Sequence, residues 1–223
     1  MLLHAVVRLA VAPLARMIYR PVIEGRDNVP SHGPVILAAN HLSFIDSVII
    51  PLVAPRPVAF LAKSEYFQGH GVRGRMMRAL FTALGAVPVE RGTHRAAQAS
   101  LDEARRILDR GQAFGIYPEG TRSRDGRIYR GRTGVGWLVL GTGAPVVPVA
   151  ILGSDRIQPV GARLPRIRRV TVRFGQPLQF PENDSSVRSA QARRFITDEI
   201  MNEIQLLSGQ ESANCYNEHQ EVA

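Results

Sequence analysis

The chain has 223 residues, of which 45% are hydrophobic, enough for one sizeable core and a single domain. Its formal net charge is +9, and every one of its 28 basic residues except Lys63 is arginine, so we expect an anionic partner such as a membrane surface, nucleic acid or a phosphorylated ligand. The single cysteine, Cys215, excludes a disulfide framework and a cysteine-rich metal site within one chain.

The N-terminal segment 2–20 mixes apolar side chains with basic ones, and it is too polar to cross a bilayer, which takes roughly 20 apolar residues. Its basic residues recur at multiples of four and therefore share one face of a helix. Such a helix suits the surface of an anionic membrane, although a helix packed on the domain has the same pattern. We expect residues 1–21 to form an amphipathic membrane-contact helix, bent or broken at Pro13. The basic residues are His4, Arg8, Arg16 and Arg20.

Predicted strands and helices alternate along the rest of the chain. Short apolar runs predict strands, and apolar residues at spacings of three and four predict helices. This alternation predicts an α/β domain with a mostly parallel, mixed sheet flanked by helices. The predicted strands lie within 22–30, 34–39, 58–62, 86–89, 113–117, 146–152 and 170–174. The predicted helices are 72–84, 94–110, 131–142 and about 188–207.

Prolines and polar residues mark where we expect irregular structure. The segment 51–57 begins and ends with proline and predicts a connection. Pro148 has no N–H for a sheet ladder, so its strand is expected to lie at an edge or to carry a bulge. Residues 22–207 contain no linker that would divide them and are expected to form one domain. The polar residues 208–223 are expected to be a flexible tail.

A histidine and an aspartate, His41 and Asp46, follow the predicted strand 34–39. Loops at strand ends are common places for catalytic residues. A neutral imidazole can take the proton of an alcohol that attacks an activated carbonyl, and a carboxylate on its other nitrogen fixes the tautomer. We interpret His41 as a general base and Asp46 as its partner. The pair alone is also compatible with an ordinary structural histidine.

Polar and charged side chains also follow three other predicted strands. Because the carboxyl ends of parallel strands meet at one edge of a sheet, these side chains are expected to surround one crevice. Its cations can hold a phosphate, and the planar arginine fork binds two oxygens at once. Taken alone, Glu90 and Arg91 are more typical of a solvated pair and Gly120 of a turn, whereas Lys63, as the sole lysine, is mildly suggestive of a site. The residues are Lys63, Glu90, Arg91, Glu119, Thr121 and Arg122.

A covalent acyl-enzyme is not favoured by the sequence. The cysteine lies in the polar tail, and no Gly-x-Ser-x-Gly elbow is present. Ser43 lies close to His41 and is the rival nucleophile. Direct attack by an acceptor hydroxyl needs no protein nucleophile, and we favour it.

Four sequence blocks stand in order along the chain: residues 40–46 (NHLSFID), 85–91 (GAVPVER), 117–123 (YPEGTRS) and 146–150 (VVPVA). Together with residues 62–65 (AKSE), they resemble the 1-acyl-glycerol-3-phosphate acyltransferase family of membrane-associated glycerolipid acyltransferases. The likeness runs from about residue 22 to 180. One departure is Glu90, which stands where aspartate is common in the family.

The resemblance implies a 1-acylglycerol-3-phosphate O-acyltransferase of phospholipid biosynthesis. It implies that an acyl thioester, either acyl-CoA or an acyl carrier protein, donates its acyl group to the free hydroxyl of the acceptor, which gives phosphatidate. No metal or further cofactor is implied. His41 is the implied base and Asp46 its partner. The implied phosphate ligands are Lys63, Arg91 and Arg122, the implied acceptor site is shaped by Glu119, Gly120 and Thr121, and the block 146–150 lines the acyl side.

The expected partners are a lysophospholipid, an acyl thioester and a membrane surface with anionic lipid, and the expected location is peripheral (monotopic) on the cytoplasmic face. The same chemistry on glycerol 3-phosphate, another lysophospholipid or a glycolipid is an alternative. A non-catalytic protein that binds anionic lipid or nucleic acid is an alternative of another class. Nucleic acid is not expected, because the basic residues stand singly at strand ends without an interleaved aromatic platform.

Overall fold

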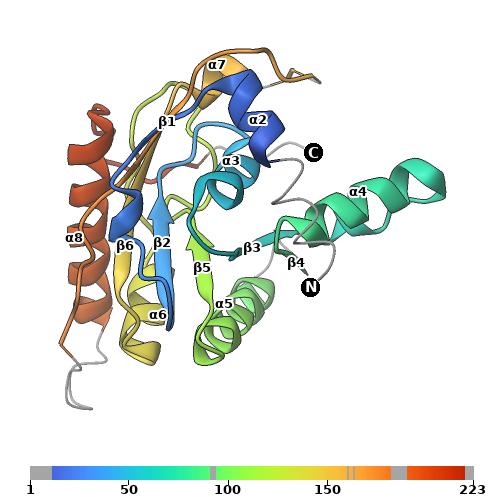
Figure 1. The fold of residues 1–223 in the computed structure, drawn as a ribbon. Helices are drawn as coiled ribbons and strands as arrows, with labels where there is room; N and C mark the ends of the chain where they lie inside the picture. Colours follow the sequence, from blue (N-terminus) through green and yellow to red (C-terminus); the bar gives the residue numbers. More distant parts are fainter. Residues whose placement is uncertain (1–11, 91–93, 160, 163, 182–189, 219–223) are drawn as a thin grey trace.

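The structure is a computed structural model that describes residues 12–90, 94–159, 161–162, 164–181 and 190–218. Its strands are β1 (Val22–Glu24), β2 (Val35–Ala39), β3 (Val58–Lys63), β4 (Ala86–Val89), β5 (Ala113–Ile116), β6 (Val146–Leu152) and β7 (Thr171–Phe174). They form one seven-stranded sheet in the order β1-β7-β6-β2-β5-β3-β4 (Figure 1). All neighbours are parallel except β6 and β7, which are antiparallel. The predicted α/β class with a mostly parallel, mixed sheet is confirmed.

Helices cover both faces of this sheet, and the central strand β2 shows why. All five of its residues are buried. Val35, Leu37 and Ala39 belong to one apolar cluster, whereas Ile36 and Ala38 belong to a second cluster. Because successive side chains of a strand point to opposite faces, each face of β2 needs its own apolar cover.

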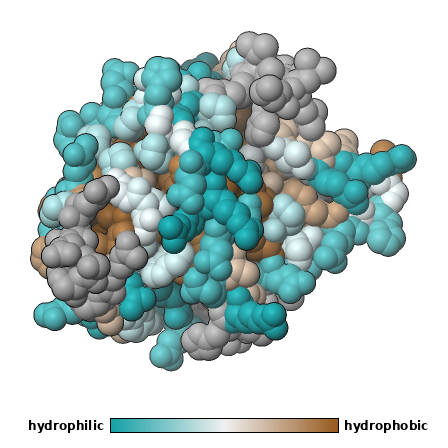
Figure 2. All heavy atoms as spheres, turned by 90° about the horizontal axis from the view of Figure 1, so that it is seen from below, coloured by the Kyte–Doolittle hydropathy of each residue, from teal (hydrophilic) through white to brown (hydrophobic). Residues whose placement is uncertain are grey.

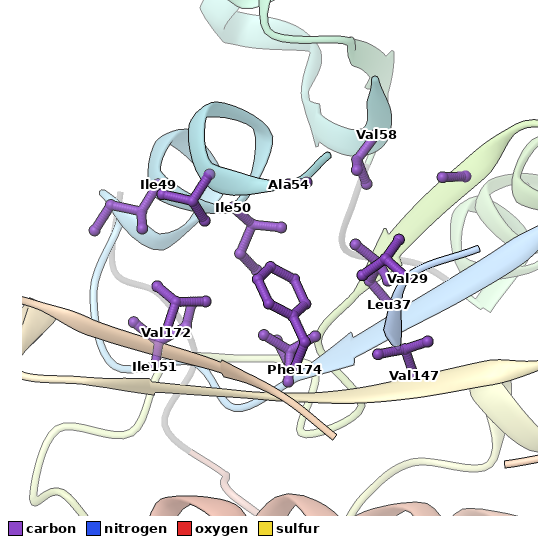
Figure 3. Close-up of a cluster of buried hydrophobic side chains, with 14 of the residues drawn as sticks. Val29, Leu37, Ile49, Ile50, Ala54, Val58, Val147, Ile151, Val172 and Phe174 are labelled. Atoms are coloured by element: carbon purple, nitrogen blue, oxygen red, sulfur yellow. The ribbon is translucent and has the colours of Figure 1, made fainter. Parts of the chain in front are cut away.

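The helices are α2 (Ala12–Tyr19), α3 (Asp46–Val53), α4 (Gly71–Ala83), α5 (His94–Asp109), α6 (Gly134–Thr142), α7 (Ser154–Ile157) and α8 (Ala190–Ser208). Residues of α5, α6 and α8 complete the cluster that contains Ile36. Residues of α3 complete the cluster that contains Leu37, where Phe174 of β7 points from the sheet towards Ile50 of α3 (Figure 3). α4 instead extends outward beside β3 and β4 (Figure 1).

The expected connection at 51–57 is wrong at its start. Helix α3 continues through Pro51 and ends at Val53. Proline in a helix removes one backbone hydrogen bond and usually disfavours this structure. Here the helix buries Ile49, Ile50 and Val53 against the sheet, and this apolar contact offsets the missing bond.

The expected edge position of Pro148 is also wrong, because β6 lies between β7 and β2. Pro148 is in register with Ala38 of β2, and its carbonyl accepts the N–H of Gly175 at 2.8 Å. A strand residue directs its nitrogen and carbonyl to the same neighbour. The nitrogen of Pro148 therefore faces the β7 side just beyond Phe174, where that strand has ended, so an interior strand tolerates the proline.

The C-terminal end of the chain differs from its prediction, whereas the N-terminal prediction is not tested by the described residues. Residues 209–218, expected to be part of a flexible tail, lie along the segment 126–130 and bond to it, as described below. In the described part of the N-terminal element, Arg16 of α2 donates to the carbonyl of Leu52 at 2.9 Å. Residues 1–11 lie outside the described residues, so the membrane-contact helix stays a prediction. Within the described ranges, every helix is too short or too polar to cross a bilayer.

Candidate active site

His41 and Asp46 come together where β2 ends and α3 begins. Nδ1 of His41 lies 3.0 Å from Oδ2 of Asp46. With the Nδ1 proton directed at this carboxylate, the lone pair of the imidazole resides on Nε2, the nitrogen that can take a proton from a substrate. The side chain of His41 keeps 12% of its surface exposed, whereas that of Asp46 is fully buried. The arrangement is a solvent-accessible imidazole on a buried carboxylate, which is the geometry that a general base needs.

The loop backbone holds the carboxylate of Asp46 in place. Its Oδ2 atom also accepts the N–H groups of Leu42 and Ser43, both at 2.8 Å. Asp46 is the first residue of α3, where a negative charge is stabilised by the helix dipole. Among the described residues, its Oδ1 atom has no hydrogen-bond partner. The His-x4-Asp spacing thus closes a small ring in which one oxygen orients the histidine and ties down two backbone groups.

Tyr117 fixes the plane of the imidazole. Its ring stacks on that of His41 with centroids 3.9 Å apart and an interplanar angle of 10°. Its hydroxyl lies 3.1 Å from Oγ of Ser47 in α3. A nearly parallel aromatic ring would also favour a protonated imidazole over the neutral one. The sequence placed Tyr117 at a strand end without a role, because a strand pattern does not reveal which ring it faces.

Glu119 is fully buried, and its carboxylate bonds to the His41 loop on one side and to Tyr129 on the other. One carboxylate oxygen accepts the N–H of His41 at 3.1 Å, and the other accepts the N–H of Tyr129 at 2.9 Å. The loop of Ser123 is tied to the same place, since its N–H donates to the carbonyl of His41 at 2.8 Å. Glu119 therefore joins the His41 loop to the block 117–123, and it does so from the interior rather than from the solvent-accessible side of the site.

Burial raises the pKa of Glu119 to about 7, although the N–H groups of Tyr129 and His41 act in the opposite direction. The unfolded chain releases this proton near pH 4.5 and the folded chain only near pH 7, so the free energy of unfolding falls as the pH rises between these values. Between pH 5 and pH 8, we expect the free energy of unfolding of the wild type to fall by about 2 kcal/mol relative to that of Glu119→Gln.

Urea unfolding of both proteins at the two pH values measures this difference. The glutamine also leaves one of the two N–H groups against an amide nitrogen, and this cost does not depend on pH. A stability difference that stays constant between pH 5 and pH 8 would show that the carboxyl group of Glu119 does not titrate in this range.

Two further predicted residues, Lys63 and Glu90, lie at this edge of the sheet. Lys63 is the last residue of β3, and Glu90 follows β4; both strands run parallel to β2 and β5, so their carboxyl ends lie on the side of His41. Lys63 is half-buried and Glu90 is exposed. Arg91 lies outside the described residues.

The block 117–123 makes a tight turn after β5. Gly120 has φ +80°, and its N–H donates to the carbonyl of Tyr117 at 3.0 Å. This φ favours glycine, and a side chain there would also press on that of Arg132. Thr121 and Arg122 follow the turn and are half-buried. The turn therefore leads from the buried Glu119 to residues that solvent can reach.

Ser43 is not placed as a nucleophile. The residue is 1% exposed, and its hydroxyl donates to the carbonyl of Gln158 at 2.7 Å. Asn40, which the sequence left without a role, is fully buried and bonds both ways to the backbone of Ile151 in β6. Its contribution is to fix the end of β2, from which His41 projects.

Comparison with known proteins agrees with these motifs. The family model described as Acyltransferase matches residues 20–152. A chloroplastic 1-acyl-sn-glycerol-3-phosphate acyltransferase of Brassica napus is 30% identical over 65% of this chain and 40% of its own length. A 1-acyl-sn-glycerol-3-phosphate acyltransferase of Borreliella burgdorferi is 28% identical over 60% of this chain and 52% of its own length. The chain thus spans about half or less of these two relatives.

A solved structure has the same fold. The crystal structure of PlsC, the 1-acyl-sn-glycerophosphate (LPA) acyltransferase from Thermotoga maritima, superimposes with a TM-score of 0.66 at 28% identity. The match covers 90% of this chain and 80% of that one. The similarity therefore extends beyond the motifs to most of the domain.

Proposed function

Because the chain belongs to the acyltransferase family, we propose that it moves a fatty acyl group from an acyl thioester to the free hydroxyl of 1-acyl-glycerol 3-phosphate, forming phosphatidate. The observation that carries this proposal is the contact of 3.0 Å between His41 Nδ1 and Asp46 Oδ2, which leaves Nε2 as the base. The names of the relatives support the choice of acceptor.

In the proposed reaction, Nε2 of His41 takes the proton of the acceptor hydroxyl as its oxygen attacks the thioester carbonyl. The new C–O bond forms, the C–S bond breaks, and the proton passes from His41 to the departing sulfur. The buried carboxylate of Asp46 stabilises the imidazolium between these steps. The donor is acyl-CoA or an acyl carrier protein thioester.

The acceptor phosphate is assigned to the cations at the neighbouring strand ends. Lys63 and Arg122 are half-buried residues at the same edge as His41, and Arg91 follows β4 in the sequence. An arginine fork binds two phosphate oxygens, while a lysine supplies a point charge. Glu119, Gly120 and Thr121 shape the loop that carries Arg122.

The test is an acyl-transfer assay with the purified chain, a labelled acyl thioester and a panel of acceptors. We expect release of free thiol together with labelled phosphatidate when the acceptor is 1-acyl-glycerol 3-phosphate. Preference for glycerol 3-phosphate, another lysophospholipid or a glycolipid would keep the chemistry and change the acceptor. No transfer to any acceptor, combined with salt-dependent binding of lipid or DNA, would contradict the proposal.

We propose further that the protein acts as a peripheral enzyme on the cytoplasmic face of an anionic membrane, with α4 as one contact. Val72, Met76 and Leu80 of α4 form a row at spacings of four and are 73%, 68% and 38% exposed. Arg75 and Arg78 flank this row and are also exposed. In Figure 2 the projecting part of the molecule carries both hydrophobic and hydrophilic surface. Apolar residues beside arginines suit an interface of acyl chains and anionic headgroups.

The substitution Met76→Glu is expected to weaken binding to vesicles that contain phosphatidylglycerol by about tenfold, because it removes an apolar group that the membrane would bury and adds a charge that anionic lipid repels. Sedimentation with the vesicles measures the bound fraction. The matched control is Leu206→Glu, which changes a 76% exposed apolar residue of α8 in the same way and is expected to bind as the wild type does. Equal binding by Met76→Glu and wild type would exclude α4 as a contact.

A further inference from the structure

The C-terminal strap, residues 209–218, lies outside the region 20–152 matched by the family model, yet it binds the active-site loops. Helix α8 ends at Ser208, and Gly209 turns the chain with φ +68°. The strap then pairs with the segment 126–130. The N–H of Ile128 donates to Glu211, that of Ala213 to Ile128, and that of Arg130 to Cys215, at 2.9, 2.9 and 2.8 Å.

One side chain of the strap reaches the residue that precedes the base. The amide oxygen of Gln210 accepts from Nδ2 of Asn40 at 2.7 Å, and its Nε2 atom donates to the carbonyl of Gly126 at 2.7 Å. Asn40 uses its other N–H and its oxygen on the backbone of Ile151. Gln210 therefore completes the bonding of the buried amide that fixes the end of β2, directly before His41.

A second side chain of the strap reaches the loop assigned to the acceptor phosphate. Asn217 is 2% exposed, and its Nδ2 atom donates to the carbonyl of Arg122 at 3.0 Å. The next residue of that loop, Ser123, donates its N–H to the carbonyl of His41. If this hydrogen bond is removed, the carbonyl of Arg122 loses its buried donor, and the loop that carries it is expected to shift or to become less stable.

We propose that the strap positions the active site from the C-terminal end of the chain, Gln210 through the His41 loop and Asn217 through the Arg122 loop. The role of each loop rests on the proposed function, whereas the positioning itself does not. Gln210 and Asn217 are positioning residues, because neither is assigned a contact with substrate. A shift of the His41 loop misplaces the base and lowers kcat, and a shift of the Arg122 loop weakens the hold on an acceptor phosphate and raises its KM.

The first test is Asn217→Asp, which keeps the shape of the side chain and places a carboxylate oxygen against the carbonyl of Arg122. We expect the KM for the phosphorylated acceptor to rise about tenfold, with kcat and the KM for the donor changed by less than about twofold. Asn214→Asp makes the same chemical change at an exposed residue of the strap and is expected to match the wild type. Equal kinetics for the two variants would overturn the assignment of Asn217.

The second test is Gln210→Met, which keeps the length of the side chain and removes both hydrogen bonds. We expect kcat to fall about fivefold with an unchanged KM for the acceptor. Unchanged kcat, or parallel changes of kcat and KM that follow only the loss of thermal stability, would overturn the positioning role. If Asn217→Asp does not fold, Gln210→Met alone tests whether the strap positions the active site.

Amide hydrogen exchange separates failure of this proposal from failure of the proposed function. If the wild-type protein transfers no acyl group, the function is wrong, but the strap is still tested by the Ser123 N–H. We expect this amide to exchange faster in Asn217→Asp than in wild type and Asn214→Asp. Identical exchange in all three proteins would overturn the positioning role whatever the substrate is.

Discussion

The substitution His41→Ala is expected to lower kcat for acyl transfer by about three orders of magnitude and to leave the fold intact. The loss is large because the imidazole is the group assigned to take the proton of the acceptor hydroxyl, and the stacked ring of Tyr117 cannot replace it. The fold survives because Asp46 retains the N–H groups of Leu42 and Ser43. Thiol release at saturating substrate measures kcat, and urea unfolding measures stability.

The matched control for this substitution is His32→Ala. His32 is exposed, and its ring contacts the hydroxyl of the neighbouring Ser31. We expect this variant to be as active as the wild type, which would show that loss of a histidine alone has no effect. Activity of His41→Ala within tenfold of the wild type would remove His41 as the base, and the mechanism with it.

The sequence could predict where the site lies because the rule that places it acts on whole strands. The predicted strands end at residues 39, 62 and 117, within one residue of the observed ends of β2, β3 and β5 at Ala39, Lys63 and Ile116. Parallel strands bring these ends to one edge, so His41, Lys63 and Glu119 were predicted there without any side-chain geometry. The prediction that Pro148 lies in an edge strand was wrong. An interior strand also tolerates a proline where its neighbouring strand has already ended, and the sequence does not show where that neighbour ends.

The bonds that hold the site could not be predicted in this way. The amide of Asn40 meets Ile151 across 111 residues of sequence, and it meets Gln210 across 170. Neither pairing leaves a periodic signal, because each depends on how two separately predicted segments end up side by side. The polar composition of 208–223 predicts fraying, but composition does not reveal the carbonyl and amide groups of segment 126–130 to which this strap bonds.

The second large effect is expected for Asp46→Asn, which should lower kcat by about two to four orders of magnitude. The asparagine oxygen can keep the contacts of Oδ2 with His41, Leu42 and Ser43, so the histidine retains its orientation. The negative charge that stabilises the imidazolium is then lost. The amide nitrogen takes the buried place of Oδ1, which in the wild type receives no hydrogen bond from the described residues. We expect about 1–3 kcal/mol of lost stability, because the hydrogen bonds to a charged carboxylate become bonds to a neutral amide oxygen.

The Asp46→Asn variant separates charge from orientation, which a deletion of the side chain cannot do. Asp46→Ala removes the acceptor of all three N–H groups, so we expect it to lose more stability than Asp46→Asn while it loses at least as much activity. The control is Asp102→Asn, an exposed carboxylate of α5 that receives a bond from Gln98 and is expected to leave kcat unchanged. If Asp46→Asn were as active as the wild type, Asp46 would serve only to shape the loop, and the charge would have no part in transfer.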